Sequence, residues 1–249
     1  MQDRMTTRRD HALRFARAEA PALVALGIAL SAVTLFLNVA DESGEAGGQS
    51  LDRAVLMAMR PNPAAPDQPW GPWWLHEAAA DLTSLGGISV LTLFALAAVG
   101  FLLISRKWLS ASLLVIGLAG GVMLSEGLKA VFERARPPAQ YQIVETLNAS
   151  FPSGHALLST VFYLTLGVML TSAFPQRRLK AYALVVAVTV AAVIGLTRIY
   201  LGAHWASDVI GGWCVGVAWA MTLWLIAHAL QRFQRSRAMP LRDEGTTSA

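Results

Sequence analysis

Residues 156–174 read ALLSTVFYLTLGVMLTSAF, a stretch that contains no charged residue. A helix needs roughly 20 mostly apolar residues to cross the hydrocarbon core of a bilayer. In lipid the backbone must satisfy its own hydrogen bonds, so a segment of this kind is expected to be α-helical. The stretch therefore predicts a membrane-spanning helix, and it sets the test for the rest of the chain.

Five further runs pass the same test, which gives about six spans. The predicted spans are Pro21–Ala40, Gly86–Ile104, Trp108–Leu128, Ala156–Phe174, Ala181–Thr197 and Val209–Leu230. The composition excludes an ordinary soluble domain, because 55% of the 249 residues are hydrophobic and only 14% are charged, against about a quarter in soluble domains. We therefore predict an all-α polytopic membrane protein, with six helices in a compact bundle and one membrane-embedded domain over residues 1–249.

The basic residues predict the orientation, since cytoplasmic loops collect Lys and Arg. If six helices alternate, 14 of the 20 basic residues lie on one side. Both tails, residues 1–20 and 231–249, are then cytoplasmic, and we expect a multi-pass protein of the bacterial inner (cell) membrane. The clusters lie between apolar runs, so we expect no nucleic-acid partner. Six basic residues break the bias and need another explanation: Arg53, Arg60, Lys129, Arg134, Arg136 and Arg198.

Residues 41–85 form a polar, Gly- and Pro-rich loop that is expected outside the cell or in the periplasm. Two short pieces around Leu51–Met59 and Trp74–Leu82 have apolar periodicity and predict short interfacial helices. Tryptophans are typical of the membrane interface, and the loop contains three of them: Trp70, Trp73 and Trp74. This pattern agrees with two roles for the loop: an interfacial flap, or one wall of a substrate entrance.

Three polar clusters lie at the helix ends that are expected on this outer side: residues 129–137, 152–155 and 198–208. A phosphate group carries up to two negative charges and requires several fixed cations and N–H donors. The cations are Lys129, Arg136 and Arg198. Ser153 and Gly154 lie where the fourth span begins, so their backbone N–H groups point outward. Together these residues predict a phosphate-binding site.

The same clusters contain two histidines that could carry out hydrolysis without a metal. If His204 opens the sixth span, Asp208 lies one turn further on, where it can accept the Nδ1 proton and leave Nε2 as an oriented nucleophile. His155 is then free to act as the acid. Structural readings are also open: Lys129 could pair with Glu126, and His204 with Asp208 could cap a helix. We expect no cofactor and no metal ligands.

At these residues the chain strongly resembles the type-2 phosphatidic acid phosphatase superfamily, which includes bacterial lipid phosphatases, glucose-6-phosphatase and the vanadium-dependent haloperoxidases. The family motifs are K-x6-R-P, P-S-G-H and S-R-x5-H-x3-D, and the chain departs from them only where Thr197 replaces serine. The resemblance covers roughly residues 84–230. It implies a six-helix catalytic core, a phosphohistidine on His204, His155 as general acid and no required metal. The residues implied to hold the phosphate are Lys129, Arg136, Ser153, Gly154 and Arg198.

The expected function is a phosphatase that cleaves the phosphomonoester or pyrophosphate of a membrane lipid, with the bilayer and that lipid as its partners. Undecaprenyl pyrophosphate, phosphatidylglycerol phosphate, phosphatidate and a phosphorylated lipid A fit this expectation equally. One alternative is a vanadium-dependent haloperoxidase, because vanadate mimics phosphate. The other is a non-catalytic lipid-phosphate binder or transporter that uses the anion site for recognition.

Overall fold

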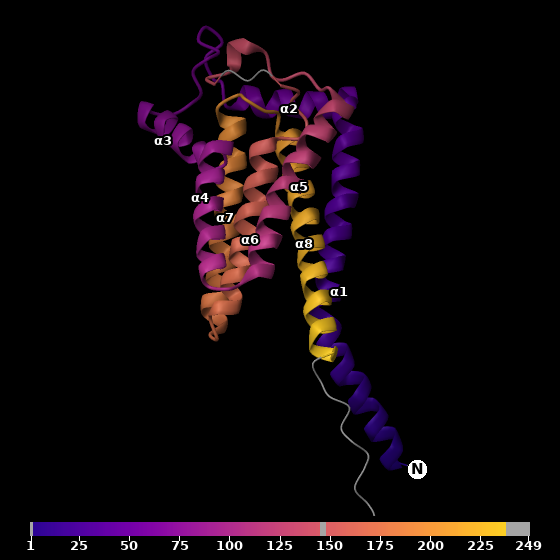
Figure 1. Cartoon of the computed structure of the whole chain (residues 1–249). Helices are drawn as coiled ribbons and strands as arrows, with labels where there is room; N and C mark the ends of the chain where they lie inside the picture. The colour runs from indigo at the N-terminus through magenta and orange to yellow at the C-terminus, as the bar shows by residue number, and fades with distance from the viewer. Residues whose placement is uncertain (1, 145–147, 238–249) are drawn as a thin grey trace, which may run out of the picture.

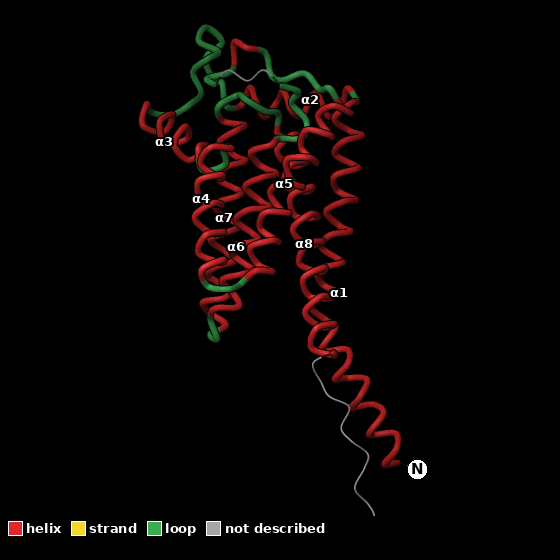
Figure 2. Tube along the Cα trace, in the orientation of Figure 1, coloured by secondary structure: helices red, strands yellow, loops and turns green. Residues whose placement is uncertain are grey.

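The structure is a computed structural model that describes residues 2–144 and 148–237, with side chains described for residues 19–45, 47–144 and 148–234. Most of the basic residues predicted in the two tails lie outside the described side chains. The described part is helical, with no strand (Figure 2). A single 3-10 turn, η1, covers Ala139–Tyr141. The α-helices are α1 Gln2–Gly44, α2 Ala46–Ala58, α3 Trp73–Ser84, α4 Ile88–Ile104, α5 Trp108–Phe132, α6 Gly154–Ala173, α7 Arg177–Tyr200 and α8 Ala206–Arg237.

Five of the described helices are long and apolar enough to cross a membrane, namely α5 to α7, most of α8 and the part of α1 from Glu19 to Gly44. α4 passes the same test only when it is taken together with α3, and the two helices meet at a bend of 48°, so the described residues contain five or six crossings. Gly86 lies at this bend, where a Cβ atom would be 2.5 Å from Cγ2 of Ile194 on α7. The predicted all-α, polytopic membrane fold is confirmed.

The first and last helices are longer than predicted. α1 begins at Gln2 and not near Pro21, and α8 continues to Arg237. The prediction followed hydropathy, which measures only the part of a helix that lies in lipid. Outside that part, Ala, Leu, Arg and Gln are good helix formers and extend both helices into the polar region.

Helix α6 lies at the centre of the bundle, in contact with α5, α7 and α8, while α1 runs along α8 (Figure 1). The main core is apolar and includes Leu114, Leu157, Val161 and Phe162. Two glycine pairs, Gly117 with Gly121 on α5 and Gly212 with Gly216 on α8, let both helices approach α6, because added Cβ atoms there would meet atoms of α6 at 3.5 Å or less. These pairs therefore serve packing within the bundle.

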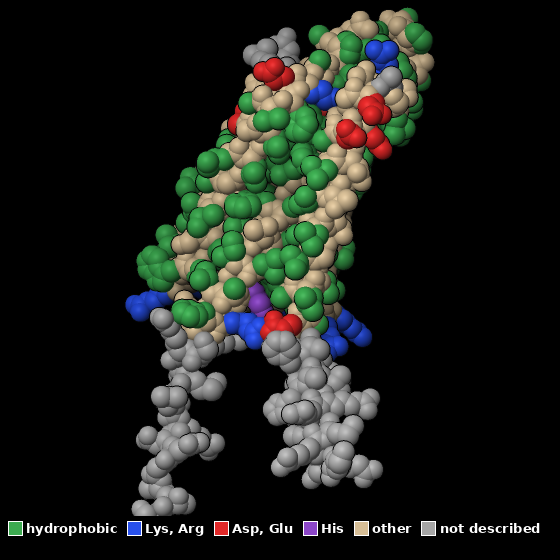
Figure 3. Space-filling view, turned by 90° about the vertical axis from the view of Figure 1, so that its right-hand side faces the viewer, with side chains coloured by type: hydrophobic (Ala, Val, Ile, Leu, Met, Phe, Trp, Pro, Cys, Tyr) green, Lys and Arg blue, Asp and Glu red, His purple; other side chains and the backbone are tan. Residues whose placement is uncertain are grey.

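The two ends of the bundle differ. We call the upper end in Figure 1 the loop end, because α2, α3 and the connection between α5 and α6 lie there. Helices α2 and α3 correspond to the two short helices that were predicted in residues 41–85. The opposite end, which we call the basic end, presents Lys and Arg (Figure 3). Its described basic residues are Arg106, Lys107, Arg177, Arg178, Lys180 and Arg232.

Candidate active site

All three predicted polar clusters meet at the loop end. They surround an open cavity of about 220 Å³ between the first turn of α4, the last turns of α5, the start of α6 and the α7–α8 loop. Six of the eight predicted site residues line it: Lys129, Arg136, Gly154, His155, Arg198 and His204. The other two, Ser153 and Asp208, are fully buried next to this lining. The structure thus brings the predicted site together.

Arg136 is fixed by backbone carbonyls. Its Nε donates to the carbonyl oxygen of Asn148 at 2.6 Å, and its Nη1 donates to that of Ala203 at 2.7 Å. Nη1 also lies 3.1 Å from Nε2 of His204. Burial lowers the pKa of the Arg136 guanidinium, while Asp208 acts in the opposite direction. A guanidinium that remains charged is therefore aimed at the cavity before any ligand binds.

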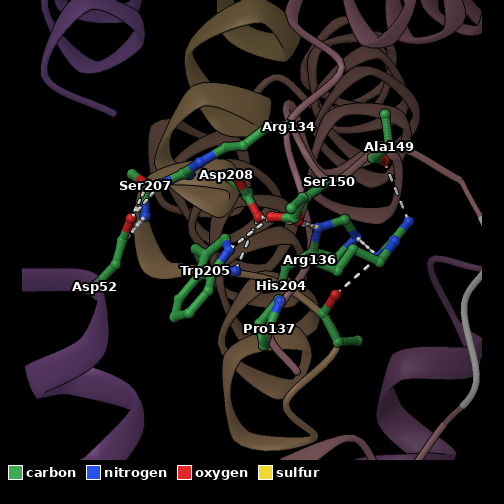
Figure 4. Close-up of polar contacts among 12 residues, drawn as sticks. Asp52, Arg134, Arg136, Pro137, Ala149, Ser150, His204, Trp205, Ser207 and Asp208 are labelled. Carbon is green, nitrogen blue, oxygen red and sulfur yellow. Dashed lines mark hydrogen bonds and ion pairs between the residues drawn. The ribbon is translucent and has the colours of Figure 1, made fainter. Parts of the chain in front are cut away.

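His204 is buried and lies two residues before α8, close to the helix start that the prediction considered for it. Because the Arg136 guanidinium can only donate, Nε2 of His204 accepts and the proton resides on Nδ1. Nδ1 faces Oδ2 of Asp208 and Oγ of Ser150, each at 3.4 Å (Figure 4). Burial, Arg136 and Arg198 lower the pKa of His204 to about 4, although Asp208 opposes them. The imidazole is therefore neutral at pH 7, with its Nε2 lone pair toward Arg136 in the cavity lining.

Asp208 lies in the first turn of α8 and holds three groups besides His204. Its Oδ2 accepts a hydrogen bond from Ser150 Oγ and another from the backbone N–H of Trp205 at 2.8 Å. Its Oδ1 accepts from Arg134 Nη1 at 2.6 Å. Asp208 thus combines the predicted helix-capping role with the predicted orientation of His204.

The start of α6 lies at the cavity, where the sequence predicts an anion-binding turn. A Cβ atom on Gly154 would come within 3.2 Å of Ser125 Oγ and 3.6 Å of Lys129 Nζ, so only glycine leaves this approach open. Lys129 Nζ also donates to Glu126 Oε1 at 2.8 Å. The predicted Lys129–Glu126 pair is therefore present, and it coexists with the placement of Lys129 in the cavity lining.

Arg198 and His155 complete the lining from α7 and α6. Arg198 is buried, and its Nη1 donates to Thr83 Oγ1 of α3 at 3.3 Å. The imidazole of His155 packs against the bend between α3 and α4, since a Cβ atom on Gly87 would lie 3.8 Å from its Nε2. Thr197, the one departure from the motifs, donates to the carbonyl oxygen of Ile194 at 2.6 Å and does not line the cavity.

Several polar atoms around the cavity are buried without a hydrogen-bond partner. They are Ser125 Oγ, Ser153 Oγ and Arg198 Nε. Such atoms are uncommon in native proteins, because an unpaired buried polar atom destabilises the fold by about 1–3 kcal/mol. These atoms lie near Lys129 and Arg136. A ligand with several acceptor oxygens could supply the hydrogen-bond partners that they lack.

The structure adds an ion-pair network that the sequence did not predict. Arg134 Nη2 donates to Oδ2 of Asp52 on α2 at 2.7 Å, and its Nη1 reaches both Asp208 and Ser207 Oγ. Asp52 in turn accepts from the backbone N–H of Ser207 at 3.0 Å and from Ser207 Oγ at 2.5 Å (Figure 4). Helix α2 at the loop end is thereby tied to the first turn of α8.

A signal for two of the missed residues was present in the sequence. Arg60 and Arg134 belong to the six basic residues that break the loop-charge bias. Arg60 is buried and donates through Nη2 to the carbonyl oxygens of Tyr141 and Tyr200, at 2.9 and 3.0 Å. Arg53 differs, because it is exposed and makes no described hydrogen bond or ion pair. Ser125 and Asp52 carried no comparable signal.

Comparison with known proteins places this arrangement in one family. A sequence profile of the PAP2 superfamily matches residues 108–232. Phosphatidylglycerophosphatase B of Bacillus subtilis is 30% identical over 146 residues, which cover 58% of this chain and 71% of that protein. An undecaprenyl-diphosphatase of Sulfolobus acidocaldarius is 32% identical over 108 residues, covering 41% and 48% of the two chains.

The fold agrees with a solved structure. A transmembrane PAP2-type phosphatidylglycerolphosphate phosphatase from Bacillus subtilis superposes with a TM-score of 0.71 over 86% of this chain and 98% of that one, at 24% identity. The profile match spans α5 to α8 and includes all three polar clusters of the cavity. The chain therefore belongs to the PAP2 superfamily, and it is a membrane-embedded phosphatase.

Proposed function

We propose that this enzyme hydrolyses the terminal phosphate of a membrane lipid through a phosphohistidine on His204, with no metal ion required. The observation that carries the proposal is the cavity itself, where His204 lies with Lys129 and Arg136 in one lining. Ser125 and Arg198 belong to the same lining, and Ser125 Oγ and Arg198 Nε have no hydrogen-bond partner among the described residues. These fixed cations supply the charge stabilisation that phosphoryl transfer needs.

Access to the cavity supports a lipid substrate. Its lining includes Ile88 of α4 and Val122 of α5, which are 67% and 41% exposed on the outer faces of the bundle. A lipid can therefore bring its phosphate in between α4 and α5 while its chains stay in the bilayer. The volume of about 220 Å³ is below the roughly 300–1,000 Å³ of pockets that enclose whole drug-sized ligands, so the cavity suits a head group and not the chains.

In the first step, Nε2 of His204 attacks phosphorus and forms a P–N bond while the bond from phosphorus to the leaving oxygen breaks. Nη1 of Arg136 gives up its contact with Nε2 as phosphorus approaches and donates to a phosphate oxygen instead, while the carbonyl oxygens of Asn148 and Ala203 hold the guanidinium. The bound phosphate brings up to two negative charges beside His155, which favours the protonated form of that imidazole. His155 donates this proton to the leaving oxygen. Asp208 stabilises the positive charge that develops on His204.

In the second step, His155 takes a proton from water as the water oxygen bonds to phosphorus. The P–N bond breaks, and the electron pair returns to Nε2 of His204. Inorganic phosphate leaves from the cradle of Lys129, Arg136 and Arg198. The enzyme is restored with Nδ1 protonated toward Asp208.

The Asp52–Arg134 pair is proposed to position the nucleophile without touching the substrate. Arg134 holds Oδ1 of Asp208, so the carboxylate can turn only its Oδ2 toward His204. Asp52 holds Arg134 from α2. Because the contact between Nδ1 and Oδ2 is 3.4 Å, at the long edge of a hydrogen bond, a small displacement of Asp208 would lose the orientation of His204.

Phosphate release from purified enzyme in detergent with excess EDTA tests this function. The panel comprises phosphatidylglycerol phosphate, undecaprenyl pyrophosphate, phosphatidate and a phosphorylated lipid A, with glucose 6-phosphate as the water-soluble comparison. We expect hydrolysis of at least one lipid in EDTA, inhibition by vanadate, and far weaker hydrolysis of the sugar phosphate. Activity that requires added magnesium, or that favours the sugar phosphate, contradicts the proposal.

We further propose that the loop end faces the periplasm or the cell exterior, because the basic end carries the topogenic Lys and Arg residues. Ala139 lies in η1 at the loop end and is exposed, whereas Cys214, the only cysteine, is buried. In a Cys214→Ala background, Ala139→Cys should react with a membrane-impermeant maleimide in permeabilised-envelope but unlysed cells. A cysteine at exposed Arg178 is the control and should react only after lysis. The reverse pattern would invert the topology.

A further inference from the structure

A second cavity lies at the basic end, remote from the active site. It has a volume of about 370 Å³ and lies between α5, α6 and the last part of α8, with the end of α4 contributing Leu102. Toward this end, α8 diverges from α5 and α6 in the view of Figure 1. None of the three polar motifs includes a residue of this cavity.

The lining changes from apolar to polar along the helix axes. Its deep part is mostly apolar, with Leu113, Leu164, Val168 and Leu223 beside Thr165. Its mouth is polar, with Lys107 at the start of α5 and Gln231 near the end of α8, both exposed. Because these helix ends lie at the level of the lipid head groups, the gradient matches a molecule with an anionic head and an apolar chain.

His228 gives the cavity a polar group that no part of the described protein satisfies. Its ring stacks on Trp224 with centroids 5.1 Å apart and planes inclined by 13°. Its Nε2 is buried without a hydrogen-bond partner, and His228 lines the cavity between the apolar part and the mouth. Lys107 likewise makes no described ion pair, in contrast to Arg232, which pairs with Glu19.

We infer that this cavity binds one anionic phospholipid from the leaflet opposite the active site. Its phosphate is held by Lys107 and His228 at the mouth, and one acyl chain fills the space between α6 and α8. A lipid in this position joins the diverging α8 to α5 and α6, so its binding stabilises the folded protein. A zwitterionic lipid has the same chain, but its phosphate is offset by its own cation and gains less from Lys107.

The test is thermal unfolding of the purified full chain, followed by tryptophan fluorescence, in mixed micelles of dioleoyl phosphatidylglycerol or dioleoyl phosphatidylcholine. Vanadate is present throughout to fill the phosphate site of the active centre. We expect phosphatidylglycerol to raise Tm by about 3 °C more than phosphatidylcholine does. Native mass spectrometry should show one retained phosphatidylglycerol per chain.

Four variants separate the possible sources of such a shift. Lys107→Gln should lose most of the difference between the two lipids, and the matched control Arg106→Gln, an exposed neighbour outside the lining, should keep it. His228→Phe preserves the stack on Trp224 and removes the unpaired nitrogen, so it should raise the lipid-free Tm and reduce the gain from phosphatidylglycerol. Equal shifts with both lipids, or a difference that survives in Lys107→Gln but disappears in Lys129→Gln, would overturn the inference.

Discussion

Basic residues occur at both ends of the bundle, but buried hydrogen bonds hold them only at the loop end, where the exposed Arg53 is an exception. Arg60 and Arg198 are 4% and 2% exposed, and Arg134 and Arg136 donate to carboxylate and carbonyl oxygens in fixed directions. At the basic end, Arg106 is exposed and makes no described contact through its side chain. A charge held by buried hydrogen bonds has a fixed position in which it can bind a phosphate. An exposed charge stays hydrated and has no fixed position.

The largest expected effects come from replacing the two histidines at the loop end. The two replacements should impair catalysis in different ways. His204→Ala removes the attacking atom, so kcat should fall by more than about 10⁴-fold for every substrate. His155→Ala removes only the proton donor, which is worth roughly 10²- to 10⁴-fold. An aryl phosphate such as p-nitrophenyl phosphate needs little protonation and should be comparatively spared. Steady-state kinetics with one alkyl and one aryl phosphate measures both effects; equal losses in the His155 variant would refute its role.

The next largest effect concerns the network behind the histidine. Arg134→Gln leaves the carboxylates of Asp52 and Asp208 without their shared cation, so we expect about 3 kcal/mol less stability and a lower kcat with a nearly unchanged KM. Asp52→Asn should cost less, since Arg134 still holds Asp208. Chemical unfolding and kinetics measure the two quantities.

Arg53→Gln is the matched control for this network, because Arg53 is the exposed neighbour of Asp52 on the same helix. It should change stability by no more than about 0.5 kcal/mol. If Arg134→Lys restores stability but not kcat, the paired geometry of the guanidinium is the essential feature. Unchanged kcat in Arg134→Gln would show that the network is structural only.

The pH dependence of the reaction tests whether the surroundings of His204 at the loop end lower its pKa. Burial, Arg136 and Arg198 lower the pKa of His204 to about 4, against the opposing effect of Asp208. Since the nucleophile is the neutral form, its fraction stays near one as pH falls from 7 and drops only when pH approaches 4. The acid limb of kcat/KM for an aryl phosphate should therefore lie near pH 4, after correction for the titration of the substrate. A limb at the ordinary histidine value of about 6.5 would show that the buried charges do not control this residue.

The smallest expected effect is at Thr197. Its hydroxyl bonds the Ile194 carbonyl within α7 and does not reach the cavity. Thr197→Ser, which restores the family motif, keeps that hydroxyl and removes one buried methyl group, so it should cost about 1 kcal/mol of stability or less. Activity should stay within about twofold. A larger gain in kcat would mean that the serine positions Arg198 in a way that threonine does not.

Two kinds of information in the sequence account for most of what could be predicted. Continuous apolar runs specify helices in lipid, and the motif spacings specify the site, so α4 to α8 and the residues around His204 lie where expected. The ends of α1 and α8 were missed because hydropathy stops at the head groups while helix formation does not.

The Asp52–Arg134 link was missed for a different reason. It joins α2 to α8 across a loop whose path depends on tertiary packing, and a single sequence records no distance between residues 52 and 134. Ser125 was missed because a serine on a spanning helix more often bonds its own backbone, and only the structure shows its Oγ unpaired beside Lys129.

The most direct test of the account is to trap the intermediate. Rapid-quench reaction with a lipid labelled in its terminal phosphate, followed by alkaline workup that preserves phosphoramidates, should place the label on the peptide that contains His204. The yield should rise in His155→Ala if loss of the base slows the second step more than the first, and no label should appear in His204→Ala. Label on Ser153, or near-normal turnover in His204→Ala, would contradict the account.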